Sequence, residues 1–184
     1  MSCDISLGRL EPCKDVVGGL RAVYFVNYGG LDGVTEDADD QITELFDAAT
    51  TTDVYKYDLK GNSSFDQTIV SSRDNGTTVF TQTLTLVLKK QDATTHKEVK
   101  LLAYGRPNII IEDNNGNAFV AGLNWGCDVT GGTISSGAAK EDFEGYNITF
   151  EAKELKPANF IDGAVLDDPF AGLTNQPNSI VSGT

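Results

Sequence analysis

The sequence predicts a mainly β protein, a two-sheet β-sandwich or barrel with one short flanking helix and extended terminal arms. Apolar and polar residues alternate over an unusually long stretch between Thr77 and Lys89, which is the pattern of a strand with one buried face. Gly is abundant at 19 residues, and Thr, Asn and Asp are frequent. This composition favours strands joined by many turns. With 184 residues the chain has the length of one domain with a substantial core.

The expected domain spans residues 19–155, between an N-terminal arm (1–18) and a C-terminal arm (156–184). Residues 1–18 mix Gly, Pro, Cys and charged residues without any period. The C-terminal segment contains Pro157, Pro169 and Pro177. Irregular ends of this kind are typical of segments that either reach a neighbouring molecule or stay loose.

The first half of the domain contains several short strand patterns. Residues 20–28 are rich in β-branched and aromatic residues between two Gly pairs, which predicts a strand. Residues 42–50 fit either a strand or a helical turn. Residues 54–59 and 64–71 flank a Lys-Gly-Asn turn, so we expect them to form a hairpin.

The strand at 77–89 follows an Asn-Gly turn, which supplies the positive φ that hairpins favour. One of its faces is the more apolar, and we expect this face to point into the core. The residues of that face are Phe80, Gln82, Leu84, Leu86 and Leu88. The opposite face is rich in threonine.

One short helix is predicted over residues 92–104. Thr95 and Glu98 have the spacing of a capping box, Gly105 ends the pattern, and Pro107 prevents its continuation. Two strands then follow at 109–112 and 118–123, on either side of an Asn-Asn-Gly turn. Residues 127–154 predict two more strands around a loop of small residues.

Charge and cysteine content exclude several functions. The net charge of −13 argues against proteins that hold nucleic acid by neutralising its phosphates, and against binding to an anionic membrane. An acidic wall still suits DNA that must slide past without sticking. Three Cys residues without a CxxC spacing predict no disulfide framework and a reducing site of synthesis. We expect neither a secretory signal nor a membrane span.

No motif predicts catalysis, a metal or a cofactor, so we expect the protein not to be an enzyme. His96 is the single histidine, and three scattered Cys residues offer no zinc spacing. The acidic stretch at 32–40 does not fit a calcium loop, and the Gly-rich stretch at 131–137 lacks the Lys of a phosphate loop. Trp125 is the single tryptophan, and we expect it to anchor the core or an interface.

Three segments resemble the tail tube (major tail) proteins of tailed bacteriophages, over about half of the chain. These segments are RDNGTTVFTQTLTLVLKK, LLAYGRPNIIIEDNNGNAFVAG and TGGTISSGAAKEDFEGYNITFEAKELKPANF. The last one is the most similar, with Gly-Tyr-x-x-Thr-Phe followed by a Glu and then Pro-Ala.

The resemblance implies a virion structural protein that assembles with itself into rings, commonly hexamers. In such proteins the inner sheets join into a channel, and the rings stack into a tube through loops and terminal arms. Genomic DNA passes through without specific binding, and no membrane is involved. Other tail or neck proteins of the virion would be the remaining partners. The protein would be made in the cytoplasm of the host bacterium and end in the virion tail.

Two groups of residues are candidates for roles in such an assembly. Acidic residues in loops or at strand ends are candidates to face a channel: Asp32, Glu36, Asp37, Asp39, Asp40, Glu141, Asp142 and Glu144. The candidates for an interface are Thr81, Thr83, Thr85 and Trp125.

Three other functions remain open from the sequence. A capsid decoration or head-completion protein is also an acidic β-domain, but it binds a capsid lattice and does not form tubes. The inner tube of a contractile injection or secretion system would have a related fold and a different cargo. A carbohydrate-binding β-sandwich would need a patch of exposed aromatic residues, for which one Trp and scattered Tyr residues are a weak basis.

Overall fold

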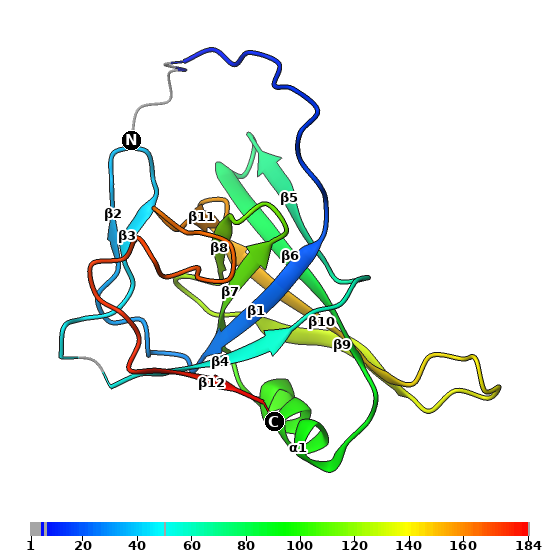
Figure 1. Cartoon of the computed structure of the whole chain (residues 1–184). Helices are drawn as coiled ribbons and strands as arrows, with labels where there is room; N and C mark the ends of the chain where they lie inside the picture. The colour runs from blue at the N-terminus through cyan, green and yellow to red at the C-terminus, as the bar shows by residue number, and fades with distance from the viewer. Residues whose placement is uncertain (1–4, 6, 50, 184) are drawn as a thin grey trace.

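The computed structural model describes residues 5, 7–49 and 51–183 (Figure 1). The protein is mainly β, with 44% of its residues in strands and 7% in helix. The strands are β1 (Leu20–Val26), β2 (Thr35–Glu36), β3 (Ile42–Glu44), β4 (Asp53–Asp58), β5 (Ser64–Ser72), β6 (Thr77–Lys89), β7 (Asn108–Asp113), β8 (Ala118–Ala121), β9 (Asp128–Ser135), β10 (Gly145–Glu154), β11 (Asn159–Phe160) and β12 (Ser179–Ser182), and the helix is α1 (Ala93–Tyr104).

Two larger sheets pack face to face. The six-stranded sheet has the order β11-β8-β7-β1-β4-β12, and the four-stranded sheet has the order β5-β6-β10-β9. Neighbouring strands are antiparallel, except that β12 runs parallel to β4. The predicted mainly β sandwich with one short helix is therefore confirmed.

The first core lies between these two sheets. Tyr146, Ile148 and Phe150 on β10 alternate with outward-facing residues and are buried. From the six-stranded sheet, Phe25 meets Phe150 with ring centroids 5.5 Å apart. Each such side chain contributes about 1.5–3 kcal/mol when it is fully buried.

β6 has the two faces that its sequence predicts. Gln82, Leu84 and Leu86 are buried in the first core or at its edge, whereas the threonines between them lie half-buried on the outer face. Both the oxygen and the nitrogen of the buried Gln82 amide form hydrogen bonds. Its oxygen accepts the Gly122 backbone N–H, and its nitrogen donates to the Lys156 carbonyl.

A second core covers the other face of the six-stranded sheet. The loop around β3 contributes Leu45 and Phe46, and the C-terminal segment contributes Ile161, Phe170 and Leu173. The same segment adds β11 and β12 to the two edges of the sheet. The segment is therefore part of the folded domain, in contrast to the expectation of a C-terminal arm from residue 156. It supplies apolar side chains that cover an otherwise bare face of the sheet.

A buried carboxylate fastens this segment to the sheet. Glu112 is 1% exposed and accepts hydrogen bonds from the Tyr24 hydroxyl at 2.9 Å and from the Asp167 backbone N–H at 2.7 Å. Burial, followed by the hydrogen bond to Glu112, raises the pKa of Tyr24 well above its usual range. Arg21 lies between Glu112 and the Asp167 carboxylate and pairs with both.

The predicted hairpin of residues 54–59 and 64–71 is wrong, because β4 and β5 belong to different sheets. Gly61 and Asn62 both have positive φ, so the turn that joins β4 to β5 is tight as expected. The chain then crosses to the other sheet instead of folding back. Ser63 holds this corner, where its hydroxyl oxygen accepts the Val87 backbone N–H at 3.0 Å.

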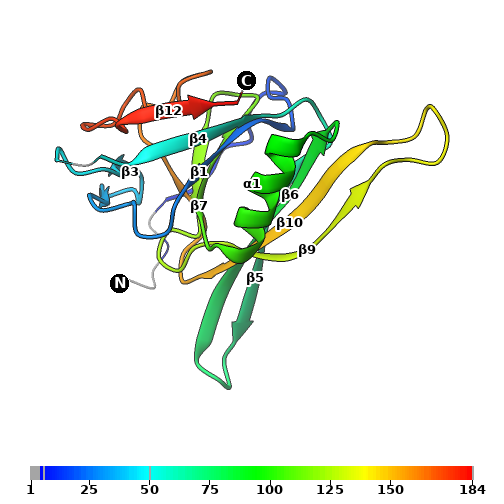
Figure 2. The same ribbon diagram turned by 90° about the horizontal axis from the view of Figure 1, so that it is seen from below.

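α1 begins and ends close to its predicted bounds, but its cap is a different residue. Asp92, and not Thr95, is the N-cap, and its carboxylate accepts both the backbone N–H and the hydroxyl of Thr95. The Gly105 N–H binds the Leu101 carbonyl at the other end. Val99 and Leu102 pack against the first core, so the helix covers one end of the sandwich (Figures 1 and 2). No helix in the described residues is long and apolar enough to cross a membrane.

The N-terminal segment lies outside both cores. Residues 7–18 have neither helix nor strand and are exposed throughout. Within residues 7–18, side-chain hydrogen bonds to the sheet are found at the end, where Asn115 exchanges two hydrogen bonds with Val17 and Asn114 donates to the Gly18 carbonyl. Asp113 organises this turn by accepting the backbone N–H groups of Asn115 and Asn117.

The first prediction concerns the C-terminal segment. Phe170 is fully buried between Tyr24 and Phe46, so Phe170→Ala should lower the free energy of unfolding by about 3–5 kcal/mol. Leu166→Ala, at a site 49% exposed, should change it by less than about 0.5 kcal/mol. Urea unfolding of both variants measures the difference. Equal stabilities would show that the segment does not cover the sheet.

The second prediction concerns the turn that holds the arm. Partial burial raises the pKa of Asp113, but the hydrogen bonds from Asn117 and Asn115 outweigh it and lower the pKa. A lowered carboxyl pKa contributes stability above the unfolded pKa of about 4, and this stability is lost as the pH falls through the folded value. The amide signals of Asn115 and Asn117 should therefore shift together in an NMR titration, with a midpoint below about pH 4. In Asp113→Asn this shared transition should disappear, and its persistence would contradict the assignment.

Candidate assembly surface

The outer face of the four-stranded sheet is a broad polar surface, which we call the threonine face. Its members share one side of the sheet, because directly paired residues of antiparallel strands point to the same face. They include Ser64, Asp66, Thr68 and Val70 on β5, Val79, Thr81, Thr83, Thr85, Val87 and Lys89 on β6, Asn147, Thr149, Glu151 and Lys153 on β10, and Asp128, Gly131 and Thr133 on β9.

Hydroxyl groups dominate the centre of the threonine face. Thr85 pairs with Thr149 on one side and with Ser64 on the other, and Thr81 pairs with Thr68. The charges on this face are few and partly balanced. Glu151 pairs with Lys153 at 3.3 Å, Asp128 pairs with Arg106 at 3.3 Å, and Asp66 and Lys89 also belong to this face. The surface is therefore neither apolar nor strongly charged.

Both edge strands of the four-stranded sheet lack a neighbour among the described residues. β5 pairs only with β6, and β9 pairs only with β10, so each leaves one row of backbone groups open. These strands span 9 and 8 residues. Long open edges are templates for pairing with another chain.

The two hairpins of this sheet project beyond the body of the molecule (Figure 2). On β5, Ile69 and Val70 are 63% and 58% exposed, and on β9 Ile134 is 51% exposed. Ile69 and Val70 point to opposite faces, so the end of the hairpin is apolar on both sides. Two consecutive apolar residues in an otherwise alternating strand mark this exposed hairpin end in the sequence. It was not among the predicted interface residues.

Trp125 lies in a tight loop between β8 and β9 and is 45% exposed, so it belongs to the surface and not to the core. The loop is closed by Gly122 and Gly126, both with positive φ, and a Cβ on Gly122 would lie 2.5 Å from the Gly126 backbone. Arg106 donates to the Trp125 carbonyl and stacks over the Tyr28 ring at 5.5 Å. Whether Trp125 contacts another subunit stays a prediction.

A buried glutamate holds this loop in place. Glu154 is 2% exposed, and one of its oxygens accepts the backbone N–H groups of Asn124 and Trp125 at 2.9 and 3.0 Å. The other oxygen accepts the Asn124 side-chain amide at 3.0 Å. Glu154 was not among the residues predicted to matter, because its position on the inner face of β10 depends on strand register.

The acidic stretch at 32–40 has a structural role beside the second core. Lys156 bridges Glu36 and Asp40, with 2.7 Å to Asp40, and Asn159 donates to Glu36. Hydrogen bonds to Asp40 and Glu36 raise the pKa of Lys156. Among the other acidic residues, Asp37 accepts the backbone N–H groups of Asp39 and Gln41, and Asp32 accepts that of Asp47.

The second acidic group lies in the loop between β9 and β10. Asp142 accepts the backbone N–H groups of Ala138 and Ala139, and these hydrogen bonds lower the pKa of its carboxyl group. Glu141 and Glu144 are exposed in the same loop. This loop and the acidic stretch at 32–40 lie at opposite sides of the molecule (Figures 1 and 2), so the fold does not bring the two groups together. Their predicted location in a channel stays a prediction.

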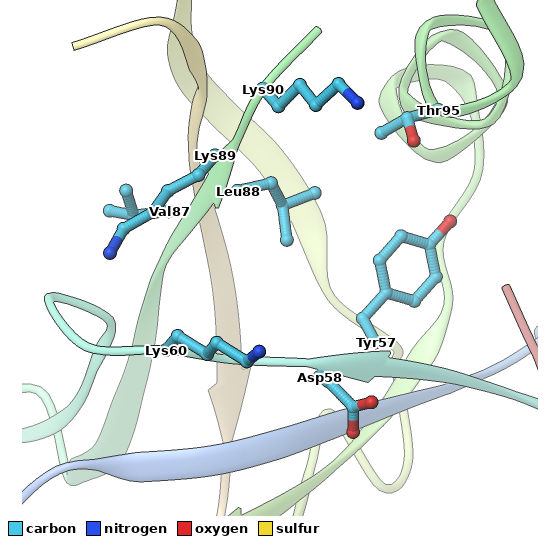
Figure 3. A pocket seen from close by; sticks show the side chains of 8 residues that line it. All are labelled: Tyr57, Asp58, Lys60, Val87, Leu88, Lys89, Lys90 and Thr95. Atoms are coloured by element: carbon cyan, nitrogen blue, oxygen red, sulfur yellow. The ribbon is translucent and has the colours of Figure 1, made fainter. Parts of the chain in front are cut away.

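The described residues line several surface pockets. In the pocket between β4, the end of β6 and α1, Lys89 points away from Lys60 and Lys90, so the three ammonium groups do not converge on one anion (Figure 3). His96 is exposed on α1. No group of three or more potential metal ligands occurs in the described residues. Cys13 and Cys127 are free thiols, burial raises the pKa of Cys127, and Cys3 lies outside the described residues.

The third prediction tests the glutamate that holds the Trp125 loop. Glu154→Ala leaves two part-buried backbone donors without their carboxylate partner, so it should lower the free energy of unfolding by about 1–3 kcal/mol. Glu151→Ala removes a carboxylate from the outer face of the same strand and should cost less than about 1 kcal/mol. Thermal unfolding with Trp fluorescence as the signal compares them. Equal losses would refute the anchoring role of Glu154.

No protein-family model, curated protein or solved structure matches this chain. The function therefore has to be inferred from the surfaces themselves: a two-faced sheet, its two open edges and its projecting hairpins.

Proposed function

We propose that the protein assembles with itself into rings that stack into a phage tail tube, a channel for genome delivery. The observation that supports it best is the four-stranded sheet, which has one polar face, two long open edges and apolar hairpin ends. A single copy leaves these features exposed, whereas pairing of the edges between copies would cover them. These features support self-assembly in general, and the more specific assignment to a phage tail tube rests on the resemblance of the three segments described above.

The strand directions favour edge-to-edge pairing between copies. Each neighbouring pair in the order β5-β6-β10-β9 is antiparallel, so β5 and β9 run in opposite directions. If β5 of one copy lies beside β9 of the next, the antiparallel pattern continues across the interface. This contact uses two different patches, so it repeats around an axis and closes into a ring when the rotation permits.

In such a ring the threonine face lines the channel. The first core holds the opposite face of the sheet, so only the threonine face is available to a lumen. Its hydroxyl groups and partly balanced charges offer no cluster of Lys or Arg to bind phosphates. The net charge of −13 adds a weak general repulsion of DNA. Such a wall suits DNA that passes without specific binding.

For one of the two acidic groups, the same geometry supports a location other than the channel expected from the sequence. The stretch at 32–40 belongs to the layer over the second core, behind the six-stranded sheet, so we assign it to the outer wall. Glu141, Asp142 and Glu144 extend from the end of the four-stranded sheet and are the candidates for the channel mouth. The location in the virion tail and the contacts with other tail or neck proteins belong to the same proposal.

The fourth prediction is that the purified protein forms rings or hollow tubes in negative-stain electron microscopy. Ile69→Lys places a charge on the β5 edge, which should abolish rings while the protein stays folded. Leu155→Lys is the matched control, because Leu155 is also 63% exposed but lies outside the four-stranded sheet. It should assemble like the wild type.

Two results would contradict this proposal. Compact monomers of the wild type at every concentration would exclude self-assembly, and binding to capsid lattices without tube formation would indicate a decoration protein. Tubes that form equally well with Ile69→Lys would place the interface elsewhere. Tubes alone do not separate a phage tail from an injection-system tube, which share this architecture and differ in cargo.

A further inference from the structure

The dipeptide Asn-Gly occurs twice in the chain, at Asn75-Gly76 and at Asn115-Gly116. The first pair lies in the turn between β5 and β6, and the second lies in the turn between β7 and β8. Asn loses its side-chain amide most readily before Gly, because Gly has no side chain to keep its backbone nitrogen away from the Asn side chain. In a folded protein the reaction also requires a turn that can bring these two groups together.

This reaction uses only atoms of the turn and water. The Gly backbone nitrogen gives up its proton to water and attacks the side-chain carbonyl carbon of Asn. The bond from that carbon to the amide nitrogen then breaks, and ammonia leaves. Water opens the resulting five-membered imide at either of its two carbonyl groups, which yields aspartate or isoaspartate. Both products carry a new negative charge, and isoaspartate also adds one carbon to the main chain.

The turn of Asn75 is free to rearrange. It lies at the tip of the β5–β6 hairpin, which projects from the body of the molecule, and both Asn75 and Gly76 are exposed (Figure 2). The Asn75 side chain makes no hydrogen bond within the described residues, and its backbone N–H donates to the Ser72 hydroxyl at 3.3 Å. A Cβ on Gly76 would meet nothing within 4 Å. The Gly76 nitrogen can therefore approach the Asn75 side chain once its 3.2 Å hydrogen bond to the Arg73 carbonyl opens.

The turn of Asn115 contains the same dipeptide but is held by hydrogen bonds and by packing. The Asn115 amide accepts the Val17 backbone N–H at 3.0 Å and donates to the Val17 carbonyl at 2.8 Å and to the Asp113 carboxylate at 3.3 Å. Gly116 lies against the C-terminal segment, where an added Cβ would be 3.1 Å from the Leu166 backbone nitrogen. Formation of the imide would break these hydrogen bonds and displace that segment, so the fold protects Asn115.

We infer that Asn75 is a site of spontaneous deamidation in the folded protein, whereas Asn115 keeps its amide. A single copy contains all the reacting groups besides water, so this modification does not rest on the proposed function. The new carboxylate lies next to Asp74 and makes the tip of the hairpin more negative. Aged copies of the protein therefore differ from new ones at the end of the same hairpin on which Ile69 and Val70 are exposed.

The test follows both Asn-Gly pairs in one sample of the full chain, incubated at mildly alkaline pH and digested with trypsin at intervals. The two pairs fall on different peptides, residues 74–89 and 101–140, because trypsin does not cut before Pro107. Mass spectrometry with fragmentation measures how much of each Asn has become an acid. In the folded protein Asn75 should deamidate at least tenfold faster than Asn115. In guanidinium chloride, where the fold no longer protects Asn115, the two rates should differ by less than threefold.

Two variants separate the effect of the fold from that of the dipeptide. Asp113→Ala removes one anchor of the Asn115 amide, so it should speed deamidation of Asn115 at least threefold and leave the rate at Asn75 unchanged. Asn75→Gln keeps an amide at the hairpin tip but would need a larger imide ring, so formation of an acid at this position should slow at least tenfold. Equal rates at Asn75 and Asn115 in the folded chain would overturn the inference. An Asn75 amide that persists in the folded chain but is lost in guanidinium chloride would also overturn it.

Discussion

The rest of the structure depends on the burial of one sheet on both faces. In β1 every residue from Ala22 to Val26 is buried, and the side chains alternate between two separate cores. Each face must be covered by another layer, because an exposed face would leave several large side chains in water. The four-stranded sheet covers one face, and the loop around β3 with the C-terminal segment covers the other. Among the described residues, no layer covers the other side of the four-stranded sheet, so the threonine face is exposed there.

Buried polar groups fix how these layers meet. Glu112 ties the C-terminal layer to the sheet through Tyr24 and Asp167, and Glu154 ties the β8–β9 loop to the four-stranded sheet. Gln82 connects the same loop to the start of the C-terminal segment. Each group has its partners, and among the described residues no buried side-chain nitrogen or oxygen lacks one. Such pairing favours a single arrangement of the layers, since a shifted arrangement would leave buried donors unpaired.

Local pattern predicted those parts of the fold whose partners are close in sequence. The faces of β6, the β7–β8 pair and the β9–β10 pair follow from alternation and turn residues. The prediction of a β4–β5 hairpin was wrong because a tight turn fixes a change of direction but does not determine which sheet the next strand joins. The expectation of a C-terminal arm was wrong for a related reason. Phe170 and Leu173 lie among Pro and Gly residues without a period, and only the uncovered face of a distant sheet gives them a place in the core. The carboxylates at 32–40 were recognised as a group, but their partners Lys156 and Asn159 lie more than a hundred residues away in the chain.

A ring built from this sheet needs curvature, and the sheet contains a feature that supplies it. The register between β9 and β10 shifts between Thr149 and Phe150, so β9 contains an extra residue there, as in a β-bulge. Bulges bend a strand and increase its twist. Gly131 and Gly132 lie next to this point, and a Cβ on Gly132 would come within 2.7 Å of the Asn147 carbonyl oxygen. The close approach of the two backbones requires glycine there. The bend therefore lies in the strand that the proposed ring uses for its contact, beside the polar face that would line the channel.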